Sequence, residues 1–185
     1  MPRERMVASA DKKLSFHDLI SAQGQFFGGF HAALAVGIEH VGFLGWITAA
    51  GIDHGPVSYT HLDVYKRQLL QCAYDKYKGD RTTLRDIVVL ELLFSTGLRV
   101  SELCSLTNEN FDLKESSARF LINGKGRKER IIQLTTPELI SLLHVYCDAY
   151  KKEISGGRSI LYNRDGRPLS TQSVRRIITR YLRCV

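Results

Sequence analysis

The sequence predicts a mainly helical domain with a small antiparallel sheet, an α+β fold, over residues 69–185. Two patterns support this fold class. Four segments place apolar residues at helical spacing, and two short strand-like segments lie on either side of a glycine-containing turn. With 44% hydrophobic and 24% charged residues, the chain has the composition of a globular protein rather than a disordered or fibrous one.

A glycine separates the first two helices of this part. Thr82 and Thr83 can cap the first helix, and Gly97 can end it. The wide apolar face of this helix consists of Ile87, Val88, Leu90, Leu92, Leu93 and Phe94. Residues 98–106 then form a short second helix, in which Arg99 and Glu102 stand three residues apart and can interact.

A basic hairpin follows. Residues 117–122 and 129–134 are expected to be strands around the turn NGKGRK, in which Gly124 and Gly126 permit the change of direction. Basic residues crowd the tip of this turn. The hairpin therefore presents positive charge at one end.

Two further helices complete the chain. Thr136 and Pro137 begin the third helix, which is expected to continue to about residue 152 before Gly156 and Gly157 stop it. A brief strand at residues 159–162 and a turn then lead to a helix capped by Ser170. The last helix is strongly basic, with Arg175, Arg176, Arg180 and Arg183.

The excess positive charge lies in the second part of the chain. Residues 1–68 carry six basic and six acidic side chains, whereas residues 69–185 carry twenty and thirteen. A basic surplus confined to one segment suits the binding of a polyanion, because each Lys or Arg placed on a phosphate releases condensed counterions. The alternative is a globular protein that is basic without a polyanionic partner.

The four cysteines argue against a metal centre. Cys72, Cys104, Cys147 and Cys184 are widely spaced and form no Cys-x-x-Cys pair. We expect reduced, mostly buried thiols, as in a cytoplasmic protein.

Residues 1–55 give a separate and weaker signal. The apolar run at residues 26–52 is longer than the ~20 residues that cross a membrane. His31, Glu39 and His40 interrupt it, and ionisable groups are unfavourable inside a bilayer. The segment is therefore either a membrane-derived fragment or part of a buried Gly/Ala-rich helix.

Residues 56–68, PVSYTHLDVYKRQ, can be back-translated into an unusual nucleotide sequence. One permitted set of codons is a single C followed by CTGTCTCTTATACACATCT and its reverse complement AGATGTGTATAAGAGACAG. This repeat resembles the transposon end used in tagmentation libraries, which implies an artefactual junction in a chimeric chain. Residues 1–55 and 69–185 would then come from different genes. The alternative is a natural linker.

Two motifs carry a family resemblance. TGLRVSEL at residues 96–103 and GKGRKER at residues 124–130, in this order among these elements, resemble the tyrosine site-specific recombinases of the phage-integrase and Xer class. The resemblance implies an incomplete recombinase catalytic domain, of which residues 69–185 are the N-terminal half. It also implies that the intact parent takes part in DNA recombination or integration, cleaving and rejoining DNA through a 3′-phosphotyrosine.

The resemblance also assigns roles to residues. Arg99 falls on the arginine that binds the scissile phosphate, and Lys125 falls on the general acid that protonates the leaving 5′ oxygen. Glu102 would orient groups of the active site. Contacts to DNA are expected from basic residues of the hairpin and the last helix: Arg127, Lys128, Arg130, Arg175, Arg176 and Arg180.

The rest of the family's machinery does not occur in the sequence. There is no His-x-x-Arg motif, and Tyr181 precedes the place of the nucleophile, so no nucleophile is assigned. The chain is therefore expected to be truncated and inactive. The resemblance implies double-stranded DNA as the partner, a tetramer of the parent on DNA, and neither a metal, a nucleotide cofactor nor a small-molecule ligand. The rival interpretation is a non-catalytic basic DNA-binding module.

Overall fold

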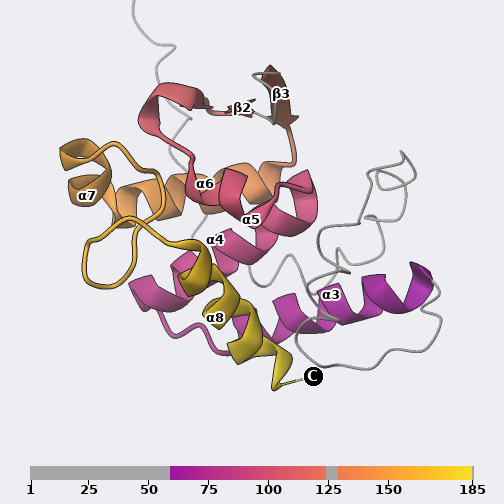
Figure 1. The fold of residues 1–185 in the computed structure, drawn as a ribbon. Coiled ribbons are helices and arrows are strands. Elements are labelled where there is room, and N and C mark those ends of the chain that lie inside the picture. The colour runs from indigo at the N-terminus through magenta and orange to yellow at the C-terminus, as the bar shows by residue number, and fades with distance from the viewer. Residues whose placement is uncertain (1–58, 124–128, 185) are drawn as a thin grey trace, which may run out of the picture. The chain divides into compact units, whose positions relative to one another are not determined.

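The computed structural model describes residues 59–123 and 129–184, with side-chain surroundings from Val64 onward. It contains a mainly helical unit with one small sheet (Figure 1), which confirms the predicted fold class. The elements are α3 (Tyr59–Asp75), α4 (Arg81–Thr96), α5 (Val100–Cys104), the 3₁₀ helix η1 (Asn108–Asn110), β1 (Phe111–Leu113), β2 (Ala118–Asn123), β3 (Glu129–Leu134), α6 (Pro137–Ala149), α7 (Lys151–Gly156) and α8 (Thr171–Leu182).

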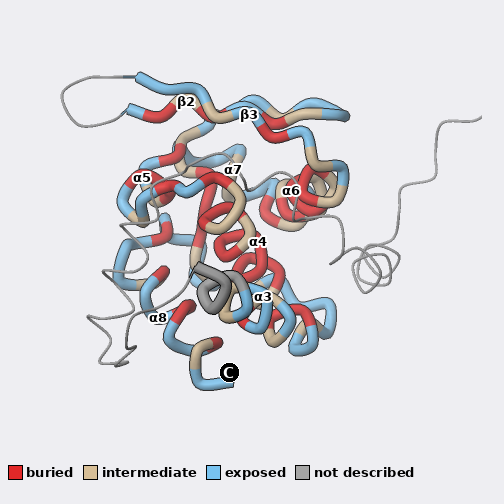
Figure 2. Tube along the Cα trace, turned by 90° about the vertical axis from the view of Figure 1, so that its right-hand side faces the viewer, coloured by how far each residue is buried: buried red, intermediate tan, exposed pale blue. Residues whose placement is uncertain are grey.

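Helix α4 forms the centre of the core. It contacts α3, α5, α6 and α8, and its residues are buried on nearly all sides (Figure 2). The carboxylate of Asp80 caps its start by accepting a hydrogen bond from Thr83 N at 2.8 Å. The predicted cap at Thr82 and Thr83 is therefore wrong, because both threonines already lie in the first turn. The predicted end is confirmed: Gly97 adopts φ 62°, and its N–H donates to the Leu93 carbonyl.

The sheet contains three antiparallel strands in the order β1-β2-β3. Along β2, Ala118, Phe120 and Ile122 are buried and alternate with more exposed residues, as expected for a strand with one face on the core. Strands β2 and β3 confirm the predicted hairpin. Strand β1 was not predicted, because its three residues are too few to show a period; Phe111 stacks on Phe120 with ring centroids 5.0 Å apart.

The connection after α6 differs from the prediction of one helix to residue 152. Helix α6 ends at Ala149, and a separate helix α7 follows Tyr150. The ring of Tyr150 stacks on Tyr146 with centroids 4.7 Å apart, and its hydroxyl donates to the Arg81 carbonyl at 2.9 Å. These contacts fix Tyr150 between α6 and the start of α4, where its backbone leaves the helical conformation.

The predicted strand at residues 159–162 is wrong. Only two isolated bridges form there, Thr107 with Ser159 and Tyr162 with Pro168. The segment is apolar because Ile160 and its two successors are buried in the core, not because it joins a sheet.

Helix α8 begins where the sequence predicts. Ser170 Oγ accepts a hydrogen bond from Ser173 N at 3.2 Å. Four apolar residues at helical spacing are buried, namely Val174, Ile177, Ile178 and Tyr181, and the helix contacts α3, α4 and α5. The arginines consequently occupy the opposite, solvent-facing side.

Helix α3 crosses the boundary predicted at residue 69. Leu69 is the first buried residue of the described side chains, followed by Ala73 and Tyr74, whereas Val64 is exposed. The contribution of α3 to the core therefore begins at Leu69. None of the described helices is long and apolar enough to cross a membrane. The apolar run at residues 26–52 lies outside the described residues.

Candidate functional site

A nearly buried glutamate joins two segments that are distant in the sequence. Glu102, in α5, is only 8% exposed. Its Oε2 accepts hydrogen bonds from Arg99 N at 2.9 Å and Arg130 Nη2 at 2.8 Å. Its Oε1 accepts from Arg99 Nη1 at 3.1 Å and Arg130 Nη1 at 3.2 Å. Two arginines, one at the start of α5 and one from β3, therefore share one carboxylate.

The turn between α4 and α5 positions Arg99. Gly97 ends α4 in the left-handed conformation, and Arg99 then has an extended backbone (φ −66°, ψ 147°) as the N-cap of α5. Glu102, at the third position of this helix, accepts from the Arg99 amide and so satisfies a donor that the helix cannot. The Arg99 side chain remains 67% exposed, so its guanidinium is available to a ligand.

Strand periodicity explains why Arg130 reaches the same carboxylate. Arg130 is paired with Ile122 in the register of β2 and β3, and residues directly opposite each other project from the same face. Ile122 is buried, so Arg130 lies on the core side, whereas its neighbour Ile131 is exposed. The sequence predicted Arg130 only as a DNA contact. The two-residue period of the strand places Arg130 on the same face as Ile122. On that face Arg130 also contacts Glu102.

Two opposing effects act on the pKa of Glu102. Burial disfavours its charged form, but the hydrogen bonds from Arg130 and Arg99 outweigh burial and lower the pKa below its ordinary value. The carboxylate is therefore ionised at neutral pH. Its charge holds both guanidinium groups in place.

The hairpin tip lies outside the described residues. This concerns Lys125, Arg127 and Lys128, whose predicted roles stay predictions. The structure places the flanking pair, Asn123 and Glu129, opposite each other at the ends of β2 and β3. The tip therefore connects directly to the strand that carries Arg130.

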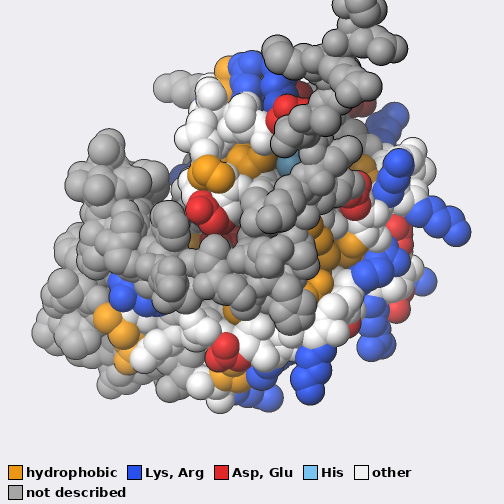
Figure 3. All heavy atoms as spheres, turned by 180° about the vertical axis from the view of Figure 1, so that it is seen from behind, with side chains coloured by type: hydrophobic (Ala, Val, Ile, Leu, Met, Phe, Trp, Pro, Cys, Tyr) orange, Lys and Arg blue, Asp and Glu red, His pale blue; other side chains and the backbone are white. Residues whose placement is uncertain are grey.

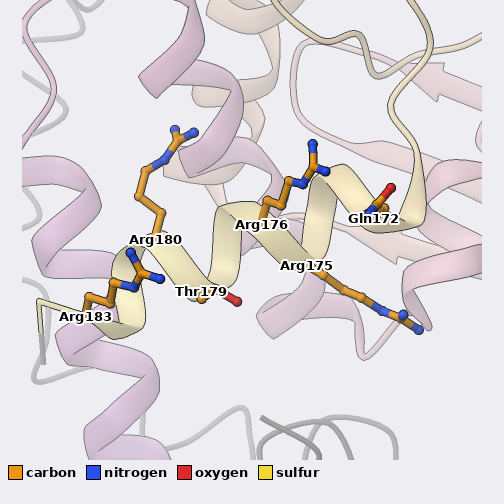
Figure 4. A pocket seen from close by; sticks show the side chains of 6 residues that line it. All are labelled: Gln172, Arg175, Arg176, Thr179, Arg180 and Arg183. Atoms are coloured by element: carbon orange, nitrogen blue, oxygen red, sulfur yellow. The ribbon is translucent and has the colours of Figure 1, made fainter.

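The arginines of α8 line a shallow groove. Its walls are Gln172, Arg175, Arg176, Thr179, Arg180 and Arg183. Figure 4 shows these side chains distributed along the helix, with Arg175 and Arg176 pointing to opposite sides. On the face visible in Figure 3, Lys and Arg side chains lie at several places and are mixed with Asp and Glu. Surface charge alone therefore does not identify the site.

Arg180 belongs to a second charged cluster. Its Nη1 lies 2.8 Å from Oδ2 of Asp86, a residue of α4 that is 0% exposed. Asp86 Oδ1 accepts hydrogen bonds from the buried Arg85, and its Oδ2 also accepts from the Tyr181 hydroxyl at 3.1 Å. This cluster was not predicted from the sequence. Its signal is the charged pair Arg85-Asp86, which lies directly before the apolar run of α4.

Tyr181 and His144, the histidine of helix α6, both have structural contacts. Tyr181 is buried, and burial together with the adjacent Asp86 raises its pKa above the ordinary value. A buried phenol whose pKa is raised is rarely ionised and is therefore a poor nucleophile. His144 Nε2 lies 3.2 Å from the Lys114 carbonyl oxygen and is half-buried.

Comparisons of the sequence and of the fold with known proteins both find recombinases. A model of the phage integrase family matches residues 63–184. A tyrosine recombinase from Agathobacter rectalis is 40% identical over 119 residues, which cover 64% of this chain and 37% of that protein. The tyrosine recombinase XerC from Chlamydia pneumoniae is 35% identical over 130 residues, which cover 69% of this chain and 38% of that protein.

Solved structures of similar fold are also recombinases. The XerA recombinase matches with a TM-score of 0.54 and 24% identity, over 71% of this chain and 43% of that one. The XerH site-specific recombinase bound to palindromic difH substrate matches with a TM-score of 0.51 and 22% identity, over 63% and 34%. The chain thus spans less than half of the length of these relatives.

Proposed function

The chain belongs to the phage integrase family, and on this premise we propose that residues 69–184 bind double-stranded DNA as part of a tyrosine recombinase catalytic domain, with Arg99 on the scissile phosphate. The observation that carries the proposal is the Glu102 carboxylate shared by Arg99 and Arg130. In the intact parent, this domain breaks and rejoins DNA through a phosphotyrosine. The XerH structure, solved with its difH substrate, supports duplex DNA as the partner.

Arg99 is suited to this role by its geometry. A guanidinium can contact two non-bridging oxygens of one phosphate, and it neutralises the charge that develops as the phosphorane forms. Arg99 uses Nη1 for Glu102, while most of its side chain is exposed. Glu102 acts on the reaction indirectly, because it orients the guanidinium that contacts the phosphate.

The remaining basic residues contribute binding rather than chemistry, with one exception. Arg175 and Arg176 on the exposed side of α8 contact DNA phosphates, as do Arg127 and Lys128 at the hairpin tip. Lys125 is the exception and donates a proton to the leaving 5′ oxygen. Arg180 has a smaller part in DNA binding than predicted, because its guanidinium is already paired with Asp86.

This polypeptide forms no covalent bond with DNA. The sequence contains no His-x-x-Arg motif, and Tyr181 is buried against Asp86. Without a nucleophile, charge neutralisation at the phosphate has no reaction to accelerate. A nicked suicide duplex, incubated with the protein and analysed on a denaturing gel, should give no shifted protein band. A covalent adduct would contradict this part of the proposal.

DNA binding itself is tested by salt dependence. Fluorescence anisotropy with a labelled duplex should show that log K falls linearly with log salt, with a slope of about −0.9 for each phosphate contacted. The variants Arg99→Ala and Arg175→Ala should each weaken binding and make the slope shallower by about 1. Arg164→Ala is the control, since Arg164 is exposed and belongs neither to the Glu102 cluster nor to the residues that line the groove of α8.

Two results would contradict DNA binding by this site. One is the absence of salt-dependent binding even at ~50 mM salt, where phosphate contacts are strongest. The other is an equal loss of affinity in Arg99→Ala and Arg164→Ala, which would indicate a general charge effect. If Arg175→Ala weakens binding but Arg99→Ala does not, the rival interpretation of a non-catalytic basic module is favoured.

A further inference from the structure

The two arginines that share Glu102 are bound to it in different ways. The guanidinium of Arg130 contacts the carboxylate at two points, with Nη2 2.8 Å from Oε2 and Nη1 3.2 Å from Oε1. The guanidinium of Arg99 contacts it at one point, with Nη1 3.1 Å from Oε1, and the second contact of Arg99 comes from its backbone amide. A two-point contact fixes a planar guanidinium better than a single one. Arg130 is therefore the main side-chain partner of Glu102.

Exposure separates the two arginines in the same way. The side chain of Arg99 is 67% exposed, whereas that of Arg130 is 42% exposed. Arg130 lies opposite the buried Ile122 in the register of β2 and β3, so it projects toward the core side of the sheet. Because Glu102 uses only Nη1 of the Arg99 side chain, the Nε–Nη2 edge of Arg99 can contact a ligand. The more exposed arginine is thus the one less occupied by Glu102.

We propose that Arg130 is a positioning residue, whose positive charge compensates Glu102 so that Arg99 keeps its full charge for a DNA phosphate. This inference rests on the proposed DNA-binding function, because it concerns the same phosphate site. It differs from the sequence-based prediction, in which Arg130 itself contacts DNA. Arg130 acts here through Glu102 and Arg99, without touching the phosphate.

The physical reason is that a carboxylate beside a phosphate-binding arginine has two opposing effects. It orients the guanidinium, but its negative charge also cancels that of the guanidinium and repels the incoming phosphate. If Glu102 had Arg99 as its only partner, the two charges would cancel. Arg130 supplies a second positive charge on the same carboxylate. Glu102 can then orient Arg99 without competing with DNA for it.

The ionisation of Glu102 agrees with this assignment. Burial raises the pKa of this carboxyl, but the hydrogen bonds from Arg130 and, after it, from Arg99 lower the pKa below its ordinary value. The Arg130 side chain has the largest part in this lowering. Arg130 therefore keeps a nearly buried carboxylate ionised while it compensates its charge.

A double-mutant cycle tests the compensation. The full chain and its variants Arg130→Met, Glu102→Gln and the double variant are titrated with a labelled duplex by fluorescence anisotropy at ~100 mM salt. Arg130→Met should weaken binding about tenfold, as much as Arg99→Ala, because Glu102 then cancels the charge of Arg99. Adding Glu102→Gln to Arg130→Met should recover most of this loss. In the unmodified background, Glu102→Gln should not strengthen binding, because Arg99 loses the group that orients it.

Three variants control for charge and folding. Arg119→Met removes the same charge from the opposite face of the sheet, where Arg119 is exposed and lies beside Asp112 and Gln133, and should weaken binding less than about twofold. Arg130→Lys keeps the positive charge and should keep most of the affinity. Circular dichroism checks that each variant is folded. If Arg130→Met fails to fold, Arg130→Gln takes its place, since it is also neutral but still donates hydrogen bonds.

The pH profile separates charge compensation from a purely structural role. In Arg130→Met, Glu102 lacks the side chain that lowers its pKa most, so it should bind a proton as the pH falls from about 7 to about 5. The affinity for DNA should then rise toward that of the unmodified protein. The double variant has no carboxyl at this position, so it is the reference for all other titrations, including that of His144. A structural defect would not be repaired by protonation.

The proposal is overturned if Glu102→Gln has the same effect in both backgrounds, because Arg130 then contacts the phosphate directly. It is also overturned if Arg130→Met and Arg119→Met weaken binding equally. Elution from a heparin column separates these results from a failure of the proposed function, since heparin is a polyanion without base pairs. If the chain binds heparin but not the duplex, DNA binding is refuted, and the salt concentration at elution gives the same cycle. Binding to neither overturns both proposals.

Discussion

Replacing Asp86 with asparagine removes a buried negative charge on which three side chains converge. Asp86 is fully buried, and it accepts hydrogen bonds from Arg85, Arg180 and Tyr181. Arg85 is nearly as buried, at 5% exposure, so it has no access to water as a substitute partner. The substitution therefore leaves a buried guanidinium without its counter-charge.

The size of the effect follows from the three contacts. Removing one partner of a buried ion pair destabilises by about 3–5 kcal/mol, whereas the half-exposed Arg180 pair adds at most about 1 kcal/mol. Asparagine keeps one carbonyl oxygen, which preserves part of the hydrogen bonding. We expect a loss of about 3–5 kcal/mol, a large share of the ~5–15 kcal/mol that stabilises a typical domain.

Urea unfolding followed by circular dichroism measures this loss. With a slope of about 2 kcal/mol per molar urea, the midpoint should fall by about 2 M while the slope stays unchanged. Asp165→Asn is the matched control, because Asp165 also lies next to an arginine but in an exposed turn. A change below ~1 kcal/mol in Asp86→Asn, the range of surface pairs, would refute the argument that this cluster holds α8 on α4.

Three further predictions concern single residues. Burial raises the pKa of Glu91 to about 7 despite the hydrogen bond from Tyr74, so the native state binds this proton more tightly than the unfolded chain, with its ordinary value of 4.5. That stabilisation is present below about pH 4.5 and is lost as the pH rises through 7. Glu91→Gln should therefore flatten the dependence of the urea midpoint on pH between these values. Parallel curves for the variant and the unmodified protein would contradict this. Gly97→Ala places a side chain at φ 62° and should lower the free energy of unfolding by about 1 kcal/mol or more, with intact secondary structure; an unchanged urea midpoint would count against it. Tyr150→Phe removes the hydroxyl that donates to the Arg81 carbonyl and should lower the free energy of unfolding by about 1 kcal/mol in the same assay; an unchanged urea midpoint would contradict this.

Local signals in the sequence were sufficient for most element boundaries. Gly97, Pro137 and Ser170 act through their own backbone or side chain, so their effect is visible without knowledge of the fold. The cap at Asp80 was not predicted, because Thr82 and Thr83 follow within three residues and threonine also caps helices. The break at Tyr150 depends on a contact with Arg81, sixty-nine residues earlier, which no local pattern encodes.

The sequence predicted individual residues of the candidate site but not the long-range contacts between them. Arg99 was found through its motif, and its contact with Glu102 was expected from their spacing. The contact between Glu102 and Arg130 spans twenty-eight residues and depends on the register of β2 with β3. Asp86 and Arg180 are ninety-four residues apart, so the solvent-facing arginine of α8 could not be recognised as partly structural.

The carboxylate of Glu102 sets how much charge an incoming anion meets. Arg99 and Arg130 together carry two positive charges, and the ionised Glu102 between them leaves one. In water, one net positive charge attracts a free phosphate ion with only a small interaction energy. A long polyanion that also reaches α8 adds many such small gains. We therefore expect the arginines to bind long polyanions in preference to small phosphate metabolites.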